Sequence, residues 1–248
     1  MKFVSDRLAQ SVFALALVLT LTSNVSHGGE HAFMQAVIAH DTARIFALAK
    51  NEENIDLATP TGKTALMVAA KAGEYPLVKW LLDNGANPHV ANHNGGTPLM
   101  FASISGEARV IKLLIEHQVD FNAQGKNGWG ALMIAAAKGH TRVVDQLLTA
   151  GAKVNTHDVY YWTPLHRAVY EERIEVSKRL LSSPGIRVNA RDDQGATALH
   201  HASQLGNLAL VTLLLSYGAD PDIADVHGLR ARHYAQKTGQ DHVLVHLN

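Results

Sequence analysis

Histidine is the only residue type in this chain that is abundant enough to suggest metal or acid–base chemistry, with 15 among 248 residues. Metal sites in proteins combine His, Cys and carboxylate ligands at short, recurring spacings. His89 and His93 are four residues apart, but they fall in an expected loop, and the neighbours His200 and His201 are expected to point apart. There is no cysteine, which excludes disulfides, thiolate ligands and a cysteine nucleophile. The histidine pattern therefore predicts no metal site.

The sequence lacks three short motifs that are typical of enzyme active sites. A nucleophile elbow, a phosphate-binding glycine loop and a zinc-binding helix motif are all missing from the sequence. The 22 basic and 22 acidic residues balance without a Lys/Arg run, whereas nucleic-acid binding needs a clustered cationic surface. We expect no enzyme activity, no cofactor and no nucleic-acid partner. A hydrolase or metal-dependent enzyme built from dispersed Asp, Glu and His remains the alternative of another class.

Aromatic residues carry a more specific signal. The chain has three tryptophans, and two of them, Trp129 and Trp162, are separated by one repeat length; Tyr160 and Tyr170 flank the second. Large aromatic side chains are common anchors of protein interfaces. Where these aromatic side chains lie depends on the secondary-structure elements that carry them, and the sequence of those elements is repetitive.

Three columns of residues recur in register with a period of 33 or 34. The first is a leucine preceded by a Thr-Pro or similar pair, the second is a Leu-Leu pair, and the third is a Gly-Ala pair. The first column comprises Leu66, Leu99, Leu132, Leu165 and Leu199. A fixed period of this length predicts a stack of similar units, because one unit cannot bury its own apolar face.

The units resemble ankyrin repeats. The characteristic hexapeptide stands as Thr-Pro-Leu-His-Arg-Ala at 163–168 and as Thr-Ala-Leu-His-His-Ala at 197–202. The resemblance implies an all-α ankyrin-repeat solenoid, in which stacked helix pairs are joined by finger hairpin loops. It also implies structural hydrogen bonds from the motif histidines His166, His200 and His233. Fold resemblance alone names no partner.

The repeat alignment gives the domain boundaries. Five repeats are expected over 59–224, between a degenerate N-terminal capping repeat at 29–58, with a helix pair over 32–48, and a C-terminal capping repeat at 225–248. Arg232 occupies the leucine column in the last unit, and a charge is costly in a buried interface, so the stack should end there. The expected repeats span 59–91, 92–124, 125–157, 158–191 and 192–224.

Local signals agree with this organisation. Thr ahead of Pro-Leu suits a helix start, because its hydroxyl caps free N–H groups and Pro fits the first turn. Glycines are expected to end each first helix at a positive φ, and these are Gly73, Gly106, Gly139 and Gly206. Repeat four departs from the pattern twice, since Tyr161 replaces the finger glycine and Glu172 replaces the glycine that ends the helix.

Residues 1–28 read as a secretory signal peptide. Lys2 and Arg7 precede a short apolar run at 12–21, and small and polar residues follow, with cleavage expected after Gly28 or Ser26. The run is short for a bilayer span, which takes about 20 apolar residues. A retained membrane anchor is the alternative. Cleavage would leave a monomer without stable membrane insertion, in the bacterial periplasm or, alternatively, outside the cell.

In ankyrin repeats the residue after the finger glycine is variable and faces the concave groove. The resemblance therefore places Trp129 and Trp162 on that surface, with Tyr160 in the same finger and Tyr170 on the first helix. Two interpretations of these rings stay open: they bind a partner, or they pack between adjacent fingers. The predicted protein-binding residues are Trp129, Tyr160, Trp162, Tyr170, Lys126, Lys138 and Glu171. We expect an exported, non-enzymatic scaffold that binds another protein, or alternatively a secreted effector that binds a host protein.

Overall fold

The computed structural model describes residues 32–36, 39, 41, 44, 47–48 and 55–247. The expected signal peptide lies outside the described residues, and so does most of the N-terminal capping repeat. Within the expected helix pair over 32–48, the described residues 32–36, 44 and 47–48 are helical. The chain divides into two compact units, Met1–Glu53 and Asn54–Asn248. The second unit carries the repeats and the predicted binding residues.

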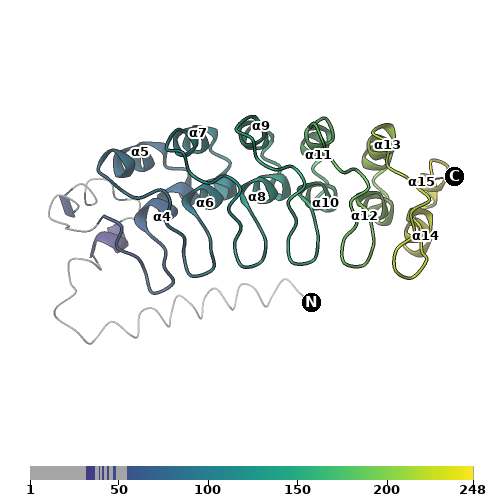
Figure 1. Ribbon diagram of the computed structural model, residues 1–248, viewed down its shortest axis with the longest axis horizontal. Helices are drawn as coiled ribbons and strands as arrows, with labels where there is room; N and C mark the ends of the chain where they lie inside the picture. The colour runs from purple at the N-terminus through teal and green to yellow at the C-terminus, as the bar shows by residue number, and fades with distance from the viewer. Residues whose placement is uncertain are drawn as a thin grey trace. The chain divides into compact units, whose positions relative to one another are not determined.

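Residues 55–247 form six helix pairs, each followed or preceded by a long finger loop (Figure 1). The structure of this unit is helical, and its described residues contain only isolated β-bridges at the stems of two fingers. The pairs are α4 (Ala65–Ala72) with α5 (Tyr75–Asp83), α6 (Pro98–Ser105) with α7 (Ala108–Glu116), α8 (Ala131–Lys138) with α9 (Thr141–Thr149), α10 (Pro164–Tyr170) with α11 (Ile174–Leu181), α12 (Ala198–Leu205) with α13 (Leu208–Ser216), and α14 (Ala231–Lys237) with α15 (Asp241–Leu244).

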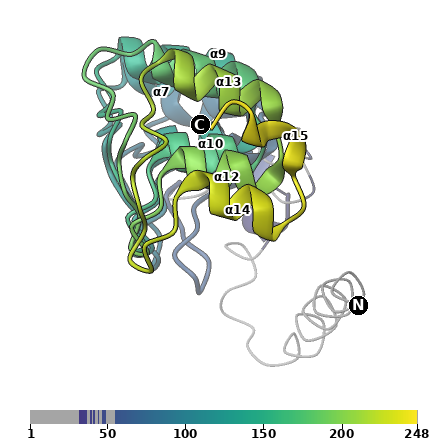
Figure 2. The ribbon, with the colours of Figure 1, turned by 90° about the vertical axis from the view of Figure 1, so that its right-hand side faces the viewer.

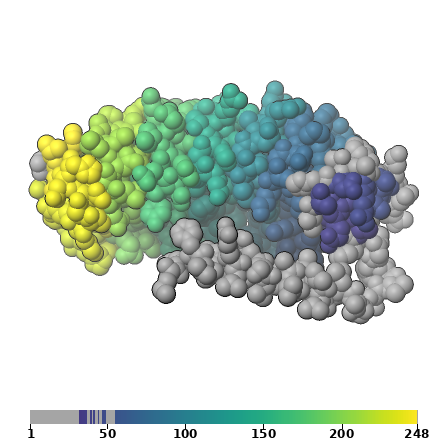
Figure 3. All heavy atoms as spheres, turned by 180° about the vertical axis from the view of Figure 1, so that it is seen from behind, coloured from purple at the N-terminus to yellow at the C-terminus, as the bar shows by residue number. Residues whose placement is uncertain are grey.

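The helices stack in two layers. Each first helix contacts the first helix of the next pair, from α4 to α14, and the second helices from α5 to α15 do the same. Seen along the row, the second helices lie above the first helices and the fingers hang to one side (Figure 2). The same repeats follow one another from blue to yellow in the space-filling view from behind (Figure 3). This arrangement is the solenoid that the 33-residue period predicts.

The core consists of the repeated columns. The five column leucines, represented by Leu132, are buried, and so are the alanines that let neighbouring helices approach, such as Ala135 and Ala136. Burying an aliphatic side chain of this size stabilises the fold by roughly 1.5–3 kcal/mol. The repeated leucines therefore supply a large share of the energy that holds neighbouring repeats together.

The local start and stop signals act as expected. The hydroxyls of Thr64, Thr97 and Thr163 each accept a hydrogen bond from the backbone N–H three residues later. The four helix-ending glycines have φ between +69° and +82° at Gly206, Gly73, Gly106 and Gly139. Repeat four adopts the same backbone without glycine, since φ is 60° at Tyr161 and 55° at Glu172.

Neighbouring fingers are joined by one backbone hydrogen bond each. In repeat three, Lys126 N–H donates to Asn94 O at 2.9 Å, and in repeat four, Val159 N–H donates to Asn127 O at 3.2 Å. The remaining bonds join His93 N to Thr61 O, Asp193 N to Tyr160 O and Val226 N to Gln194 O. These bonds fix the fingers in register, so side chains at equivalent finger positions become neighbours.

The last helix pair differs from the others. Arg232, in the leucine column of α14, is only partly buried, and the second helix of this pair has four residues. Among the described residues, no helix has both the length and the apolar character needed to cross a membrane.

Candidate functional site

The concave face lies between the first helices and the fingers. Each first helix presents one side chain at the same position of this face, and the residue after each positive-φ finger residue lies beside it. The helix residues are Val68, Phe101, Ile134, Arg167, His201 and Tyr234, and the finger residues are Lys63, Gly96, Trp129, Trp162, Ala196 and Leu229. The two tryptophans therefore occur at one structural position in consecutive repeats.

Arg167 links the two tryptophans. Its guanidinium carbon lies 4.7 Å from the ring centroid of Trp129 and 4.4 Å from that of Trp162. A guanidinium over an aromatic ring is favourable by roughly 0.5–2 kcal/mol, more as water is excluded. Both rings are half-buried, so they pack through Arg167 and still present part of their surface to the groove.

Asp158 holds Arg167 in this place. Its side chain is fully buried, forms an ion pair with the Arg167 guanidinium, and accepts hydrogen bonds from the backbone N–H groups of Tyr160 and Trp162 at 2.9 and 3.0 Å. The finger turn and the Arg167 side chain are thus fixed by one carboxylate. Sequence reasoning missed both residues, although their nine-residue separation recurs in the next two repeats.

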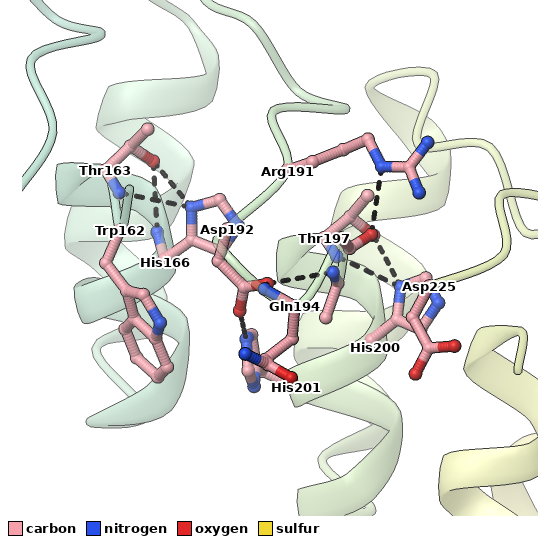
Figure 4. A network of polar contacts seen from close by, with 12 residues as sticks. Trp162, Thr163, His166, Arg191, Asp192, Gln194, Thr197, His200, His201 and Asp225 are labelled. Carbon is pink, nitrogen blue, oxygen red and sulfur yellow. Dashed lines mark hydrogen bonds and ion pairs between the residues drawn. The ribbon is translucent and has the colours of Figure 1, made fainter. Parts of the chain in front are cut away.

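A second set of rings extends the first toward repeat five. Trp162 contacts Tyr170 edge-on with centroids 5.2 Å apart, and it lies 4.5 Å from His201. His201 Nε2 is 3.0 Å from Asp192 Oδ2, and Figure 4 shows this carboxylate between the helices that carry His166 and His201. We call Trp129, Trp162, Arg167, Tyr170 and His201 the aromatic patch. Tyr170 is its most open member, with 49% of its surface exposed.

An aspartate column underlies the C-terminal half of the face. Asp158, Asp192 and Asp225 each use Oδ1 to accept two N–H groups of their own finger and Oδ2 to contact a side chain nine residues later. The side-chain partners are Arg167, His201 and Tyr234. The three aspartates thus have the same backbone hydrogen bonds but contact three different types of polar side chain.

These contacts perturb the acidities of the groups involved. Burial opposes ionisation of Asp192, but hydrogen bonds from His201 and the Ala196 N–H hold its pKa below the ordinary value. The pKa of Asp225 is lowered in the same way, against its burial, by the Leu229 N–H and the Tyr234 hydroxyl. Burial, followed by the hydrogen bond to Asp225, raises the pKa of Tyr234.

The motif histidines make the structural hydrogen bonds that the resemblance implies. The Nδ1 atoms of His166, His200 and His233 accept the N–H of the residue three positions earlier, at 3.2, 3.1 and 2.9 Å. Burial lowers the pKa of His166 to about 4 and also lowers the pKa of His200. The described residues contain no group of three or more His, Asp or Glu side chains that could hold a metal ion.

The other predicted site residues lie at the margins of the aromatic patch. Tyr160 is 58% exposed on the fingertip, where the described residues offer its ring no aromatic partner, while the adjacent Tyr161 stacks on His157 at 4.7 Å. Glu171 lies next to Tyr170 and 4.0 Å from the Arg173 guanidinium. Lys126 and Lys138 are exposed and lie on the other side, beside Trp129.

An apolar cavity of about 580 Å³ opens beside Trp129, between repeats two and three. We call it the groove pocket. Its apolar lining is Met100, Phe101, Ile104, Trp129 and Ile134, and its polar lining includes Lys71, Asn92, Asn94, Lys126, Asn127 and Lys138. The predicted binding residues include Trp129, Lys126 and Lys138 of this lining, whereas its other apolar residues were not predicted, although Phe101 and Ile104 share repeat positions with Arg167 and Tyr170.

Comparison with known proteins gives matches along most of the chain. A family model described as ankyrin repeats (3 copies) matches residues 13–92, 33–125, 71–158 and 119–192, and one described as ankyrin repeat matches 194–226. The crystal structure of the human ASB11 ankyrin repeat domain is similar with a TM-score of 0.78 at 25% identity, covering 87% of this chain and 97% of that one.

Sequence relatives match over shorter segments. Palmitoyltransferase ZDHHC17 of Homo sapiens is 37% identical over 79 residues, which is 32% of this chain and 12% of the relative. Regulatory protein SWI6 of Kluyveromyces lactis is 57% identical over 42 residues, which is 17% of this chain and 6% of the relative. The chain thus spans a small part of these curated relatives, and the similarity lies in the repeats. With its helix pairs, its fingers and the family match along most of its length, this chain belongs to the ankyrin repeat family.

Proposed function

We propose that this protein is a non-enzymatic scaffold that binds another protein through its concave groove and finger loops, with the aromatic patch as the main anchor. Ankyrin repeats generally mediate protein–protein binding. The supporting observation is that the rings of repeat four are fixed in place by buried contacts while Tyr170 and Tyr160 remain half exposed. Interface anchors have this character, because little side-chain entropy is lost on binding.

The backbone of repeat four supports the same proposal. Tyr161 adopts φ 60° where the other five fingers have glycine. A bulky residue in this region costs of order 1–3 kcal/mol, and such strain tends to occur at functional positions. A tyrosine at the fingertip therefore has a cost to folding that a binding role would offset.

We also propose that the chain is exported and acts as a monomer in the bacterial periplasm. The support is the sequence of residues 1–28, which has the three-part layout of a signal peptide. The alternative is a secreted effector that binds a host protein. N-terminal sequencing of the purified protein should give a start near Gly29, and fractionation of the native host would place it in the periplasm or the medium. Intact protein starting at Met1 in the membrane fraction would contradict cleavage of a signal peptide and favour the retained membrane anchor.

Affinity capture from the native host, followed by mass spectrometry, tests the binding function. Trp129→Ala with Trp162→Ala should abolish partner capture while the helical circular dichroism spectrum persists, and each truncation should cost about 2 kcal/mol or more in binding. Because both rings also contact Arg167, Tyr170→Ala is the cleaner variant: its ring is half exposed and its aromatic contacts are with Trp162 and His201 alone among the described residues.

The matched control is Lys63→Ala, which changes the same finger position two repeats from Trp129. It should leave capture unchanged. If the double variant and Tyr170→Ala both capture the partner with unchanged affinity, the aromatic patch is structural. If the double variant unfolds and Tyr170→Ala binds normally, the rings serve packing between fingers.

A further inference from the structure

The groove pocket exists because one repeat lacks a side chain that its neighbours have. Trp129 and Trp162 follow the positive-φ finger residue in repeats three and four, whereas repeat two has Gly96 there. A Cβ atom at Gly96 would lie only 3.3 Å from the Phe101 ring, so even a small side chain would cover it. The Phe101 ring is therefore left partly open to the groove, and Ile104 and Ile134 continue the apolar floor.

Three lysines surround this floor. Lys71 lies in the last turn of α4, Lys126 on the finger of repeat three, and Lys138 at the end of α8. All three are exposed, and within 55–247 no acidic side chain forms an ion pair with any of them. The pocket thus combines an apolar floor with an uncompensated positive rim.

The same pocket has free hydrogen-bond donors. Asn92 and Asn127 use their Oδ1 atoms to accept backbone N–H groups of their own fingers. Their side-chain NH2 groups, and that of Asn94, donate no hydrogen bond within the described part of the chain. Amide donors spaced along a groove suit the carbonyl groups of an extended peptide.

We propose that the groove pocket binds an extended acidic segment of the partner protein, with one large apolar side chain on the floor and flanking Asp or Glu side chains at Lys71, Lys126 and Lys138. This inference rests on the proposed protein-binding function and specifies the chemistry of the partner. A volume of about 580 Å³ accommodates a Phe or Leu side chain together with adjacent backbone. Because the rim is cationic, acidic flanks are attracted and basic flanks are repelled.

Fluorescence anisotropy with defined peptides tests the proposal. The probe is a fluorescein-labelled nonapeptide, Glu-Asp-Glu-Asp-Phe-Asp-Glu-Asp-Glu, titrated with the purified chain at low salt. Two matched peptides replace Phe by Ser or every acidic residue by Lys. The Phe-containing acidic peptide should bind at least tenfold more tightly than either, and its affinity should fall as salt rises, because ions screen exposed charges.

The protein variant that tests the rim carries Lys71→Glu, Lys126→Glu and Lys138→Glu. It should bind the acidic probe at least tenfold more weakly without a change in melting temperature, since the three side chains are exposed. The matched control, with Arg142→Glu, Lys153→Glu and Lys178→Glu, has the same net charge but alters exposed side chains away from the groove pocket. It should bind the probe like the unmodified chain.

Three results would overturn the proposal. One is equal affinity for the acidic and basic peptides, and another is equal loss of binding in the two triple variants. The third is binding of dodecanoate, an anionic amphiphile, without binding of the acidic peptide. Capture of the native partner distinguishes a wrong assignment of the groove pocket from a wrong proposal of protein binding. If the partner still binds the rim variant but not Tyr170→Ala, the aromatic patch binds and the groove pocket does not.

Discussion

The two halves of the concave face use the same backbone for different chemistry. In repeats one to three the finger residue is Thr59, Asn92 or Gly125, and the helix residue nine positions later is apolar, as in Phe101 and Ile134. In repeats four and five and the last helix pair the finger residue is aspartate, and its partner is Arg167, His201 or Tyr234. The N-terminal half is therefore apolar with free lysines, while the C-terminal half consists of paired charges and rings.

This difference shows which repeat positions tolerate different residue types. The column leucines and the positive-φ finger positions are uniform through the five repeats, because each is required to stack one repeat on the next. Threonine caps the first helix in four of these repeats, and Gly130 stands there in the third. The residue pair nine apart tolerates Asn with Phe as well as Asp with Arg. We therefore expect the binding specificity to be carried by positions that stacking does not constrain.

The largest expected effect is on the leucine column that both halves share. Leu132→Asp would bury an unpaired carboxylate between repeats, and we expect a loss of several kcal/mol, about 4, in the free energy of unfolding. Urea unfolding followed by circular dichroism measures it. Lys178→Asp on the exposed face of α11 is the control and should change stability by less than about 0.5 kcal/mol. An unchanged melting curve for Leu132→Asp would mean that the column is not the core.

The second prediction concerns variants that replace one residue pair of the C-terminal half by its equivalent from the N-terminal half. Arg167→Phe removes the partner of the fully buried Asp158 side chain and should destabilise the fold by about 3 kcal/mol. Asp158→Asn together with Arg167→Phe recreates the Asn92 and Phe101 pair of repeat two. The double variant should recover at least half of that loss, measured by urea unfolding. If it is no more stable than Arg167→Phe, the two halves are not interchangeable at this position.

The third prediction concerns pH and the motif histidines. His166 titrates near its unfolded value of 6.5 in the denatured chain but with a pKa of about 4 in the fold, so the unfolded state binds the proton first as the pH falls. Stability should be full above pH 6.5 and decline toward pH 4, by up to about 3 kcal/mol from this residue. The lowered pKa of His200 acts in the same direction.

The N-terminal half provides the control for this titration, because Met67, Met100 and Met133 occupy the histidine position there. His166→Met should flatten the decline between pH 6.5 and 4, whatever its effect at pH 7. Urea unfolding at pH 7.0, 5.5 and 4.5 measures the slope. An equal slope in the variant would assign the acid sensitivity to other groups. Asp192 and Asp225 do not contribute to the decline in this range. Their pKa values are lowered in the fold, so the stability that these carboxylates add is lost only as the pH falls below the ordinary carboxyl pKa of 3.8.

The fold was predictable from sequence because its determinants are local and repeated. The positive φ at Tyr161 and Glu172 follows from their alignment with glycines, and the structural role of His166 follows from the ankyrin motif. The site was predictable only in part. Trp129 and Trp162 were placed by their column, but the guanidinium between them depends on Asp158, and the groove pocket depends on the side chain that Gly96 lacks. Such features depend on contacts between side chains at two different repeat positions. The pattern of residues at one repeat position does not reveal them.

The smallest expected effect isolates the fingertip of repeat four. Tyr161→Gly restores the residue that the other five fingers have, and it should stabilise the fold by up to about 1 kcal/mol, because glycine adopts a positive φ without strain. The loss of the stack on His157 offsets part of this gain. Thermal unfolding measures the net change, and Gly195→Ala in the next finger is the reverse control, which should destabilise. If the fingertip binds the partner, Tyr161→Gly should raise the melting temperature and weaken capture together. A variant that is less stable than the original would show that Tyr161 is held there by packing, and the strain argument for a binding role would fail.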